Sequence, residues 1–265
     1  GTLYTNATGA FTKLGNENVT ITGIITTAAE LNKVAAATSG KVTATLVANT
    51  TIDSAAVTAL KDVKASDNIT FDSTATTIAG SELSALLAIY KIIPNADFSL
   101  ITSITAVNAS DVALVKNAIK LVAPTATVTF NVGEISAADA NTISNATSGA
   151  VTATIKDGSV AATLKALKDV DVIAKADVFT FASTDKTAKA SELVALADKI
   201  GDANFTAAKI ETVTGTALDA ASGDIAAALG LTNIAANPEV KISGTVDSAY
   251  IKAIISATTG KVTAT

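Results

Sequence analysis

The sequence lacks several residue types on which common protein chemistries depend. It contains no cysteine, methionine, tryptophan or histidine, and neither arginine nor glutamine. Without cysteine there is no disulfide bond and no thiolate centre, and without histidine the commonest general base and metal ligand are missing. Lysine is the main cation, charged residues make up 16% of the chain, and the net charge is −5. This excludes the basic patch that neutralises phosphates, so we expect no nucleic-acid partner.

Aromatic side chains and long hydrophobic runs are also scarce. Hydrophobic residues make up 49% of the chain and aromatic residues only 4%, while alanine alone accounts for about a fifth. A core of such small side chains is thin and suits stacked layers better than a sphere. The longest apolar stretch, residues 86–93, is interrupted by Lys91 and is too short to span a bilayer, so we expect no membrane span.

The sequence repeats itself over a long period. The segment TSGKVTAT at residues 38–45 returns as TSGAVTAT at 147–154 and as TTGKVTAT at 258–265, so the copies lie about 110 residues apart. ALKDV at 59–63 and at 166–170 keeps a similar offset. The chain opens without methionine or a signal peptide and stops inside this motif, which predicts a segment of a longer or processed polypeptide.

A shorter repeat lies inside the long one. Short segments that alternate apolar and polar residues recur every 22 to 35 residues or so, and alternation is typical of a half-buried strand. They begin at Val19, Val42, Ile69, Phe98, Val128, Val151, Val178, Phe205, Val240 and Val262. The aromatic residues of these strands, such as Phe71, Phe130 and Phe181, are expected to point inward.

Helices are predicted between the strands. Four possible starts pair an N-cap residue with an acid three residues later, which satisfies a free amide and suits the helix dipole. They are Thr27 with Glu30, Asn108 with Asp111, Ser136 with Asp139, and Thr216 with Asp219. Gly40, Gly149 and Gly260 follow helical stretches, where a left-handed C-terminal cap is expected to form a structural turn.

These patterns predict an α/β fold, an open repeat solenoid. We call one strand with the helix that follows it a rung. A single rung cannot bury its own apolar face, so neighbours must stack into one parallel β-sheet with a layer of short helices. The prediction is an irregular or capping segment at residues 1–18, followed at 19–265 by about nine rungs with a super-repeat of about 110 residues. A doubly wound sheet also alternates strands and helices, but it does not repeat such a block.

The outward face of the strands is a candidate site. A ladder of threonines is expected there, at Thr43, Thr70, Thr129, Thr152, Thr206 and Thr263. Threonine is a good strand former, and stacked hydroxyl groups can bond along a sheet, so the ladder has a plain structural explanation. The alternative is an array that binds ice or another surface, although Asp72, Ala208 and Ser243 interrupt its second column.

Motifs for metal binding and catalysis are weak. The nearest acidic cluster, Asp169 with Asp171, has no calcium-loop pattern around it, so no cofactor is expected and structural calcium remains a minor alternative. Ser183-x-x-Lys186 and Ser66-Asp67-Asn68 match two elements of penicillin-binding enzymes, but in reverse order and without Lys-Thr-Gly. The sequence therefore predicts a protein that is not an enzyme.

From about residue 18 onward, the alanine- and threonine-rich rungs, with TSGKVTAT and TAAELN at 27–32, resemble repeat tracts of giant cell-surface proteins. Such tracts occur in marine cyanobacteria and in virion proteins of their phages. The resemblance implies an exported, extended protein, extracellular or at the cell surface, used for coating, adhesion or surface motility.

The prediction for function is a structural repeat protein. It forms an extracellular fibre, surface layer or stalk by stacking rungs, and its partner is itself, head-to-tail or laterally. The alternative is an adhesive module that binds polysaccharide or another surface through the threonine-lined sheet face. The small number of aromatic residues, which normally stack on sugars, argues against the alternative.

Overall fold

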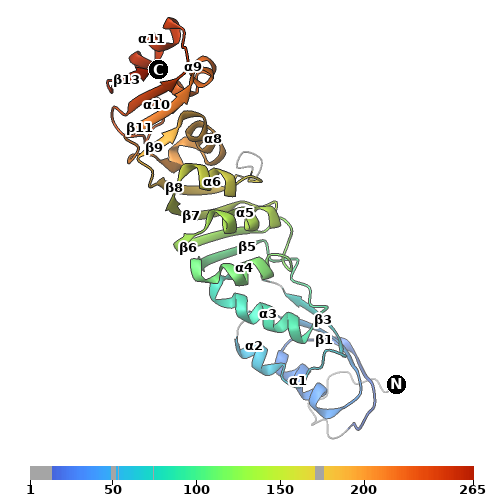
Figure 1. Cartoon of the computed structure of the whole chain (residues 1–265). Helices are drawn as coiled ribbons and strands as arrows, with labels where there is room; N and C mark the ends of the chain where they lie inside the picture. Colours follow the sequence, from blue (N-terminus) through green and yellow to red (C-terminus); the bar gives the residue numbers. More distant parts are fainter. Residues whose placement is uncertain (1–13, 49–51, 53, 74, 171–175) are drawn as a thin grey trace. The chain divides into compact units, whose positions relative to one another are not determined.

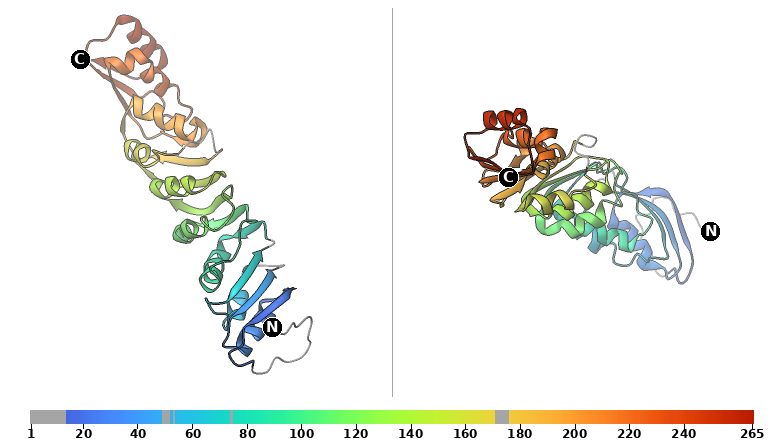
Figure 2. Two further views of the ribbon diagram at one scale, coloured as in Figure 1. Left: turned by 90° about the vertical axis from the view of Figure 1, so that its right-hand side faces the viewer. Right: turned by 45° about the horizontal axis from the view of Figure 1, so that its top comes forward.

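The computed structural model describes residues 14–48, 52, 54–73, 75–170 and 176–265 (Figure 1). These residues divide into two compact units. The N-terminal unit comprises Gly1–Val132 with Ala146–Gly149, and the C-terminal unit comprises Gly133–Asn145 with Ala150–Thr265. In each unit, parallel strands alternate with helices that lie along one side of them (Figure 2).

The N-terminal unit carries two sets of parallel strands, in the orders β1-β2-β3 and β4-β5-β6. Its elements are β1 (Val19–Ile25), α1 (Ala28–Ala37), β2 (Val42–Ala48), α2 (Ser54–Ala59), β3 (Asn68–Ser73), β4 (Thr77–Ala79), the 3-10 turn η1 (Gly80–Glu82), α3 (Leu83–Ile92), β5 (Ser103–Asn108), η2 (Ala109–Asp111), α4 (Val112–Ala118) and most of β6 (Thr127–Ile135).

The C-terminal unit repeats this order of elements. Its strands pair in parallel as β7-β8-β10 and as β9-β11-β12-β13. The elements are α5 (Ala137–Ala146), β7 (Val151–Gly158), α6 (Val160–Ala166), β8 (Val178–Ser183), β9 (Thr187–Lys189), α8 (Ala190–Ile200), η3 (Asp202–Asn204), β10 (Phe205–Thr206), β11 (Thr212–Thr216), α9 (Ala217–Ser222), α10 (Asp224–Leu229), β12 (Glu239–Ser243), α11 (Ser248–Ala257) and β13 (Val262–Ala264).

The core lies between the strands and the helices of each unit. Along β2, Val42, Ala44 and Leu46 are buried, whereas Thr43 and Thr45 are only half-buried, as the alternating pattern predicts. The inward direction of Phe71, Phe130 and Phe181 is also confirmed. Two pairs of phenylalanine rings pack against each other in the core. The ring centroids of Phe71 and Phe98 are 5.5 Å apart, and those of Phe181 and Phe205 are 5.9 Å apart.

Three of the four predicted helix starts are confirmed. The hydroxyl groups of Thr27, Ser136 and Thr216 each accept a hydrogen bond from the amide three residues later. Asn108 does not cap a helix with its side chain, because the chain enters the 3-10 turn η2 there and no such bond forms. The serine and threonine side chains therefore identified helix starts correctly, whereas the asparagine side chain did not.

The α/β class with parallel strands and helices is confirmed. Over the described residues, no end strand pairs back onto the opposite end of its set, so the sheets are open and form no barrel. Of the irregular segment predicted at residues 1–18, positions 1–13 lie outside the described residues. Its last part joins the fold: Gly15 bridges to Thr38, and the Asn18 side chain accepts the amide of Lys41 at 2.8 Å.

The helix start at Thr216 generates a prediction about pH. Hydrogen bonds donated by the backbone and hydroxyl of Thr216 lower the pKa of Asp219 below its ordinary value of 3.8. A carboxylate with a lowered folded pKa contributes stability that is complete above the unfolded pKa and is lost as pH falls through the folded pKa. The free energy of unfolding lost in an Asp219→Asn variant should therefore be largest above pH 3.8 and should shrink below it.

Urea denaturation of the parent and the variant, repeated from about pH 6 down to about pH 2.5, measures this difference. A difference in unfolding free energy that stays constant over the whole range would show that the carboxylate charge contributes nothing at this helix start.

Candidate functional site

One turn occurs three times in the chain and makes the same bonds each time. In its three copies, the hydroxyl of Thr38 donates to the carbonyl of Glu17, that of Thr147 to Ala126, and that of Thr258 to Pro238. Each of these hydroxyls also accepts the amide two residues ahead, from Gly40, Gly149 and Gly260. The turn thus ties the end of one helix to the residues just before the strand that precedes that helix.

The three glycines of this turn do not adopt the left-handed conformation that we expected. None of them has a positive φ, unlike Gly201 or Gly223. The turn needs glycine because of crowding: a Cβ atom at Gly40, Gly149 or Gly260 would lie 2.2 Å from a backbone oxygen of the preceding rung. Glycine therefore permits close backbone approach between rungs.

A buried carboxylate completes the joint on the other side. The amide that opens β2, from Val42, donates to Oδ1 of Asp67 at 2.9 Å, and the amide that opens β7, from Val151, donates to Oδ1 of Asp177 at 2.7 Å. Both aspartates are nearly inaccessible to solvent. Their second oxygens accept from the Lys64 amide and from the Ser144 hydroxyl, respectively.

An asparagine and an aspartate join the helix layer at the same step. The side chain of Asn32 donates to Asp62 and accepts the Asp62 amide, at 2.8 and 2.7 Å. Asn141 and Asp169 form the same reciprocal pair, at 3.2 and 3.0 Å. The two copies lie in different units, so each unit builds this joint independently.

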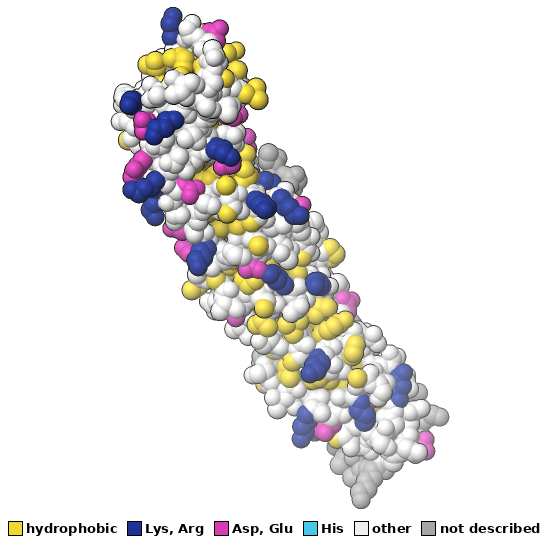
Figure 3. Space-filling model, viewed as in Figure 1, with side chains coloured by type: hydrophobic (Ala, Val, Ile, Leu, Met, Phe, Trp, Pro, Cys, Tyr) yellow, Lys and Arg dark blue, Asp and Glu magenta, His cyan; other side chains and the backbone are white. Residues whose placement is uncertain are grey.

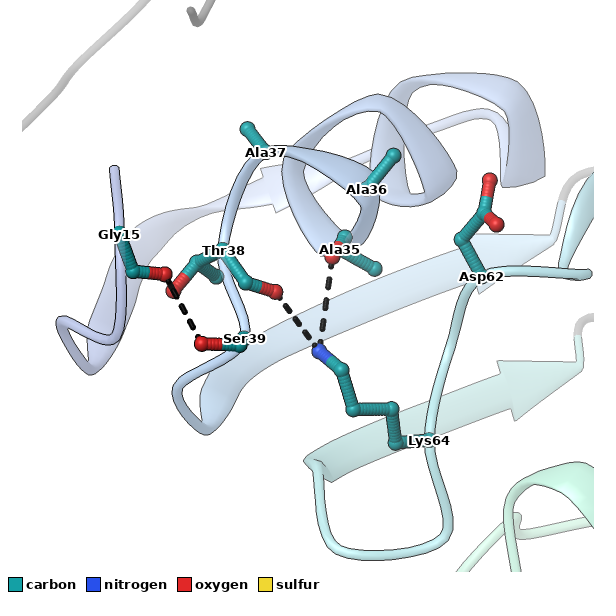
Figure 4. A pocket seen from close by; sticks show the side chains of 8 residues that line it. All are labelled: Gly15, Ala35, Ala36, Ala37, Thr38, Ser39, Asp62 and Lys64. Carbon is teal, nitrogen blue, oxygen red and sulfur yellow. Dashed lines mark hydrogen bonds between the residues drawn. The ribbon is translucent and has the colours of Figure 1, made fainter. Parts of the chain in front are cut away.

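A surface hollow lies beside the first joint (Figure 4). The Lys64 side chain closes one side of it, and its ammonium group donates to the carbonyls of Thr38 at 2.9 Å, Gly40 at 3.4 Å and Ala35 at 3.5 Å. Across the turn, the Ser39 hydroxyl donates to the carbonyl of Gly15. The polar groups that reach the hollow are therefore engaged with the protein, which makes it part of the joint.

The expected threonine ladder does not form a single column. Its members lie on the outer side of the strands: Thr43, Thr129, Thr152 and Thr263 are half-buried, and Thr70 and Thr206 are exposed. The strand register pairs Thr43 with Thr20 on one side but with Asn68 on the other. It pairs Thr152 with Val178, Thr206 with Ala182, and Thr263 with Lys241. The strand β3 is shifted by two residues relative to β2, so Thr70 pairs with Thr45 and not with Thr43.

Over the described ranges, no group of three or more acidic side chains is placed to hold a metal ion, and Asp171 of the expected cluster lies outside those ranges. No described helix is long and apolar enough to cross a bilayer. On the face shown in Figure 3, lysine and acidic side chains are interspersed.

Comparisons with known proteins give no relatives. No protein-family model, curated protein or solved structure matches this chain.

The residues that join the rungs were missed from the sequence, although a signal for them was present. ALKDV recurs at 59–63 and 166–170, and its aspartate is the partner of the helix asparagine in both copies. The buried Asp67 and Asp177 share a weaker signal, an aspartate two residues before apolar-Thr-Phe, and their distance from ALKDV differs between the copies. The side chains of the joint hydrogen-bond to backbone amides and to one another.

The crowding at the turn predicts which glycine substitutions the chain tolerates. Gly149→Ala should lower the free energy of unfolding by about 2 kcal/mol, because the new methyl group forces the backbones of two rungs apart. Gly23→Ala is the matched control, since nothing lies within 4 Å of its added Cβ and its φ is not positive. Chemical denaturation measures both.

A third variant separates the two explanations of the turn. Asparagine tolerates the left-handed conformation, so Gly149→Asn would be nearly harmless if a positive φ were the requirement. We expect it to be at least as destabilising as Gly149→Ala.

The buried carboxylate predicts a larger loss. Asp177→Ala leaves the Val151 amide and the Ser144 hydroxyl without this acceptor and should cost about 3 kcal/mol of unfolding free energy. Asp198→Ala, on the exposed side of α8, is the control and should change stability by less than about 0.5 kcal/mol. Equal effects of the two substitutions would contradict a role of Asp177 in joining rungs.

Proposed function

We propose that the chain is a structural repeat protein, an open solenoid whose rungs stack into an extended element at the cell surface or outside the cell. The single observation that carries the proposal is the recurrence, about 110 residues apart, of the same joint between consecutive rungs. The threonine turn, the crowded glycine, the asparagine–aspartate pair and the bond from the strand's first amide to a buried aspartate all return.

The chemistry of the joint supports a scaffold better than an enzyme. Its polar groups form hydrogen bonds with backbone amides, with backbone carbonyls and with each other, and these bonds stabilise one arrangement of neighbouring rungs. The sequence offers no histidine or cysteine for proton transfer or nucleophilic attack. A scaffold role also agrees with the recurrence of the joint, because each added rung covers the previous one.

The adhesive alternative has less support. Sugar-binding surfaces present aromatic rings, whereas Phe71, Phe98, Phe179 and Phe205 are fully buried here. The irregular spacing of the outer threonines also removes the flat lattice that a surface-binding array needs. Self-association into a fibre or layer remains part of the proposal and depends on the end rungs.

A chain with one duplicated block tests the proposal. Inserting a second copy of residues 43–151 after Val151 adds 109 residues and reproduces the junction between a valine and a threonine that the chain already has. Four further rungs at about 4.8 Å each should lengthen the particle by about 19 Å and leave its cross-section unchanged. Small-angle X-ray scattering measures both dimensions.

The melting temperature gives a second readout. Added rungs that stack should leave it equal or raise it, because stability in an array grows with each interface between neighbours. A copy that folds as a separate body would instead add its own diameter to the maximum dimension, and that result would overturn the proposal.

A further inference from the structure

The surface formed by α11 and β13 corresponds to a surface that is covered elsewhere in the chain. By sequence, α11 and β13 align with α1 and β2 and with α5 and β7, at the offset of about 110 residues. In those two copies, the next rung covers the surface: β3 pairs along β2, and β8 pairs along β7. Beyond β13, no described strand fills this place.

The side chains of this surface, which we call the β13–α11 face, are exposed where their counterparts are buried. Ile255 is 54% exposed, although the equivalent Ala35 and Ser144 are 2% and 0% exposed. Val262 is half-buried, whereas Val42 and Val151 are inaccessible. Figure 3 shows apolar side chains at the surface at this end of the C-terminal unit.

The backbone of β13 is also oriented to receive a strand. Val240 donates its amide to the carbonyl of Lys261, and Thr265 donates to Ile242, so the amides of Val262 and Ala264 point away from β12. The amide of Val262 takes the position of the Val42 and Val151 amides, which donate to Asp67 and Asp177. A carboxylate is therefore the group that completes this edge.

We propose that the β13–α11 face binds a rung of one particular type, the type that follows this surface twice within the chain. Such a rung carries an aspartate just before a strand with the pattern apolar-Thr-Phe, as in residues 67–71 and 177–181. It carries a second aspartate five or eight residues earlier, at the place of Asp62 and Asp169. The inference rests on the proposed function and names the partner of one end.

Charge supports this partner. Lys252 on α11 takes the place of Asn32 and Asn141, which bind Asp62 and Asp169 in the internal copies. In place of the amide–carboxylate bonds, a lysine at this position would form an ion pair with the aspartate that the partner rung carries at the place of Asp62 and Asp169. The face thus offers an amide and an ammonium group to two carboxylates, and the exposed Ile255 to the apolar side of a helix.

The strand at the other end of the described chain is a poorer match. The strand β1 aligns with β6 and β12, which in this chain follow β5 and β11. The approach to β1, residues 16–19, reads Asn-Glu-Asn-Val, so the longer side chain of Glu17 stands where the matching rungs have an aspartate, and no Thr-Phe follows. Simple head-to-tail stacking of this segment on itself would therefore set an unmatched pair of rungs together.

Extension of the full chain tests the proposal. A copy of residues 155–183 is joined after Thr265, where it stands in the same order as in the internal block. The amide of Val262 should then exchange with deuterium at least tenfold more slowly, because it becomes buried and hydrogen-bonded. The control is the same extension with the copied Asp177 replaced by asparagine, which should restore fast exchange at Val262.

A third extension decides between rung types. A copy of residues 14–41, which begins with the approach to β1, should give less protection at Val262 than the copy of residues 155–183. Equal or greater protection would overturn the proposal in favour of head-to-tail stacking, and no protection with either extension would overturn it outright. The block-duplication experiment does not involve β13, so it tests the proposed function separately.

Discussion

The structure depends on the hydrogen bond between the amide that opens one strand and a buried carboxylate at the start of the next rung. In the Val42–Asp67 and Val151–Asp177 bonds the aspartate side chains are nearly inaccessible to solvent, where a polar group without partners would be costly. Each carboxylate is acceptable there because its second oxygen is also bonded, by Lys64 or Ser144. A neighbour in the wrong register would leave this carboxylate unsatisfied, so the bond selects one register where alternating small residues alone would allow slippage.

The glycine turn and the aspartate act on opposite sides of the same strand. Gly149 lets the backbone approach the preceding rung so closely that no side chain fits, and Asp177 ties the strand to the following one. The buried apolar residues are mainly isoleucine, alanine, valine and leucine, with a few phenylalanines. Such a core tolerates swaps between aliphatic side chains of similar volume, so packing alone fixes one arrangement only loosely. A few polar contacts with fixed geometry add specificity to this apolar packing.

Much of this fold could be predicted from the sequence, because strand alternation and helix caps are local signals. The alternation of Val42, Thr43 and Ala44 and the caps at Thr27, Ser136 and Thr216 behaved as expected. Two interpretations were wrong for a common reason. Glycine at the turn was interpreted from its own conformation, and the threonine ladder from equal spacing, whereas both depend on contacts with a neighbouring rung. Such contacts leave no trace within a short window of sequence.

In the array that we propose, the two ends would not be interchangeable. If any rung could stack on any other, alanine-rich strands with exposed edges would associate without control. In the N-terminal unit, the surface of α1 and β2 is completed by two aspartates, and in the C-terminal unit that of α5 and β7 is completed in the same way. In the proposed array, the rung that supplies the carboxylates would set the order, and Lys252 on α11 would strengthen that requirement by adding a charge that an acidic neighbour matches.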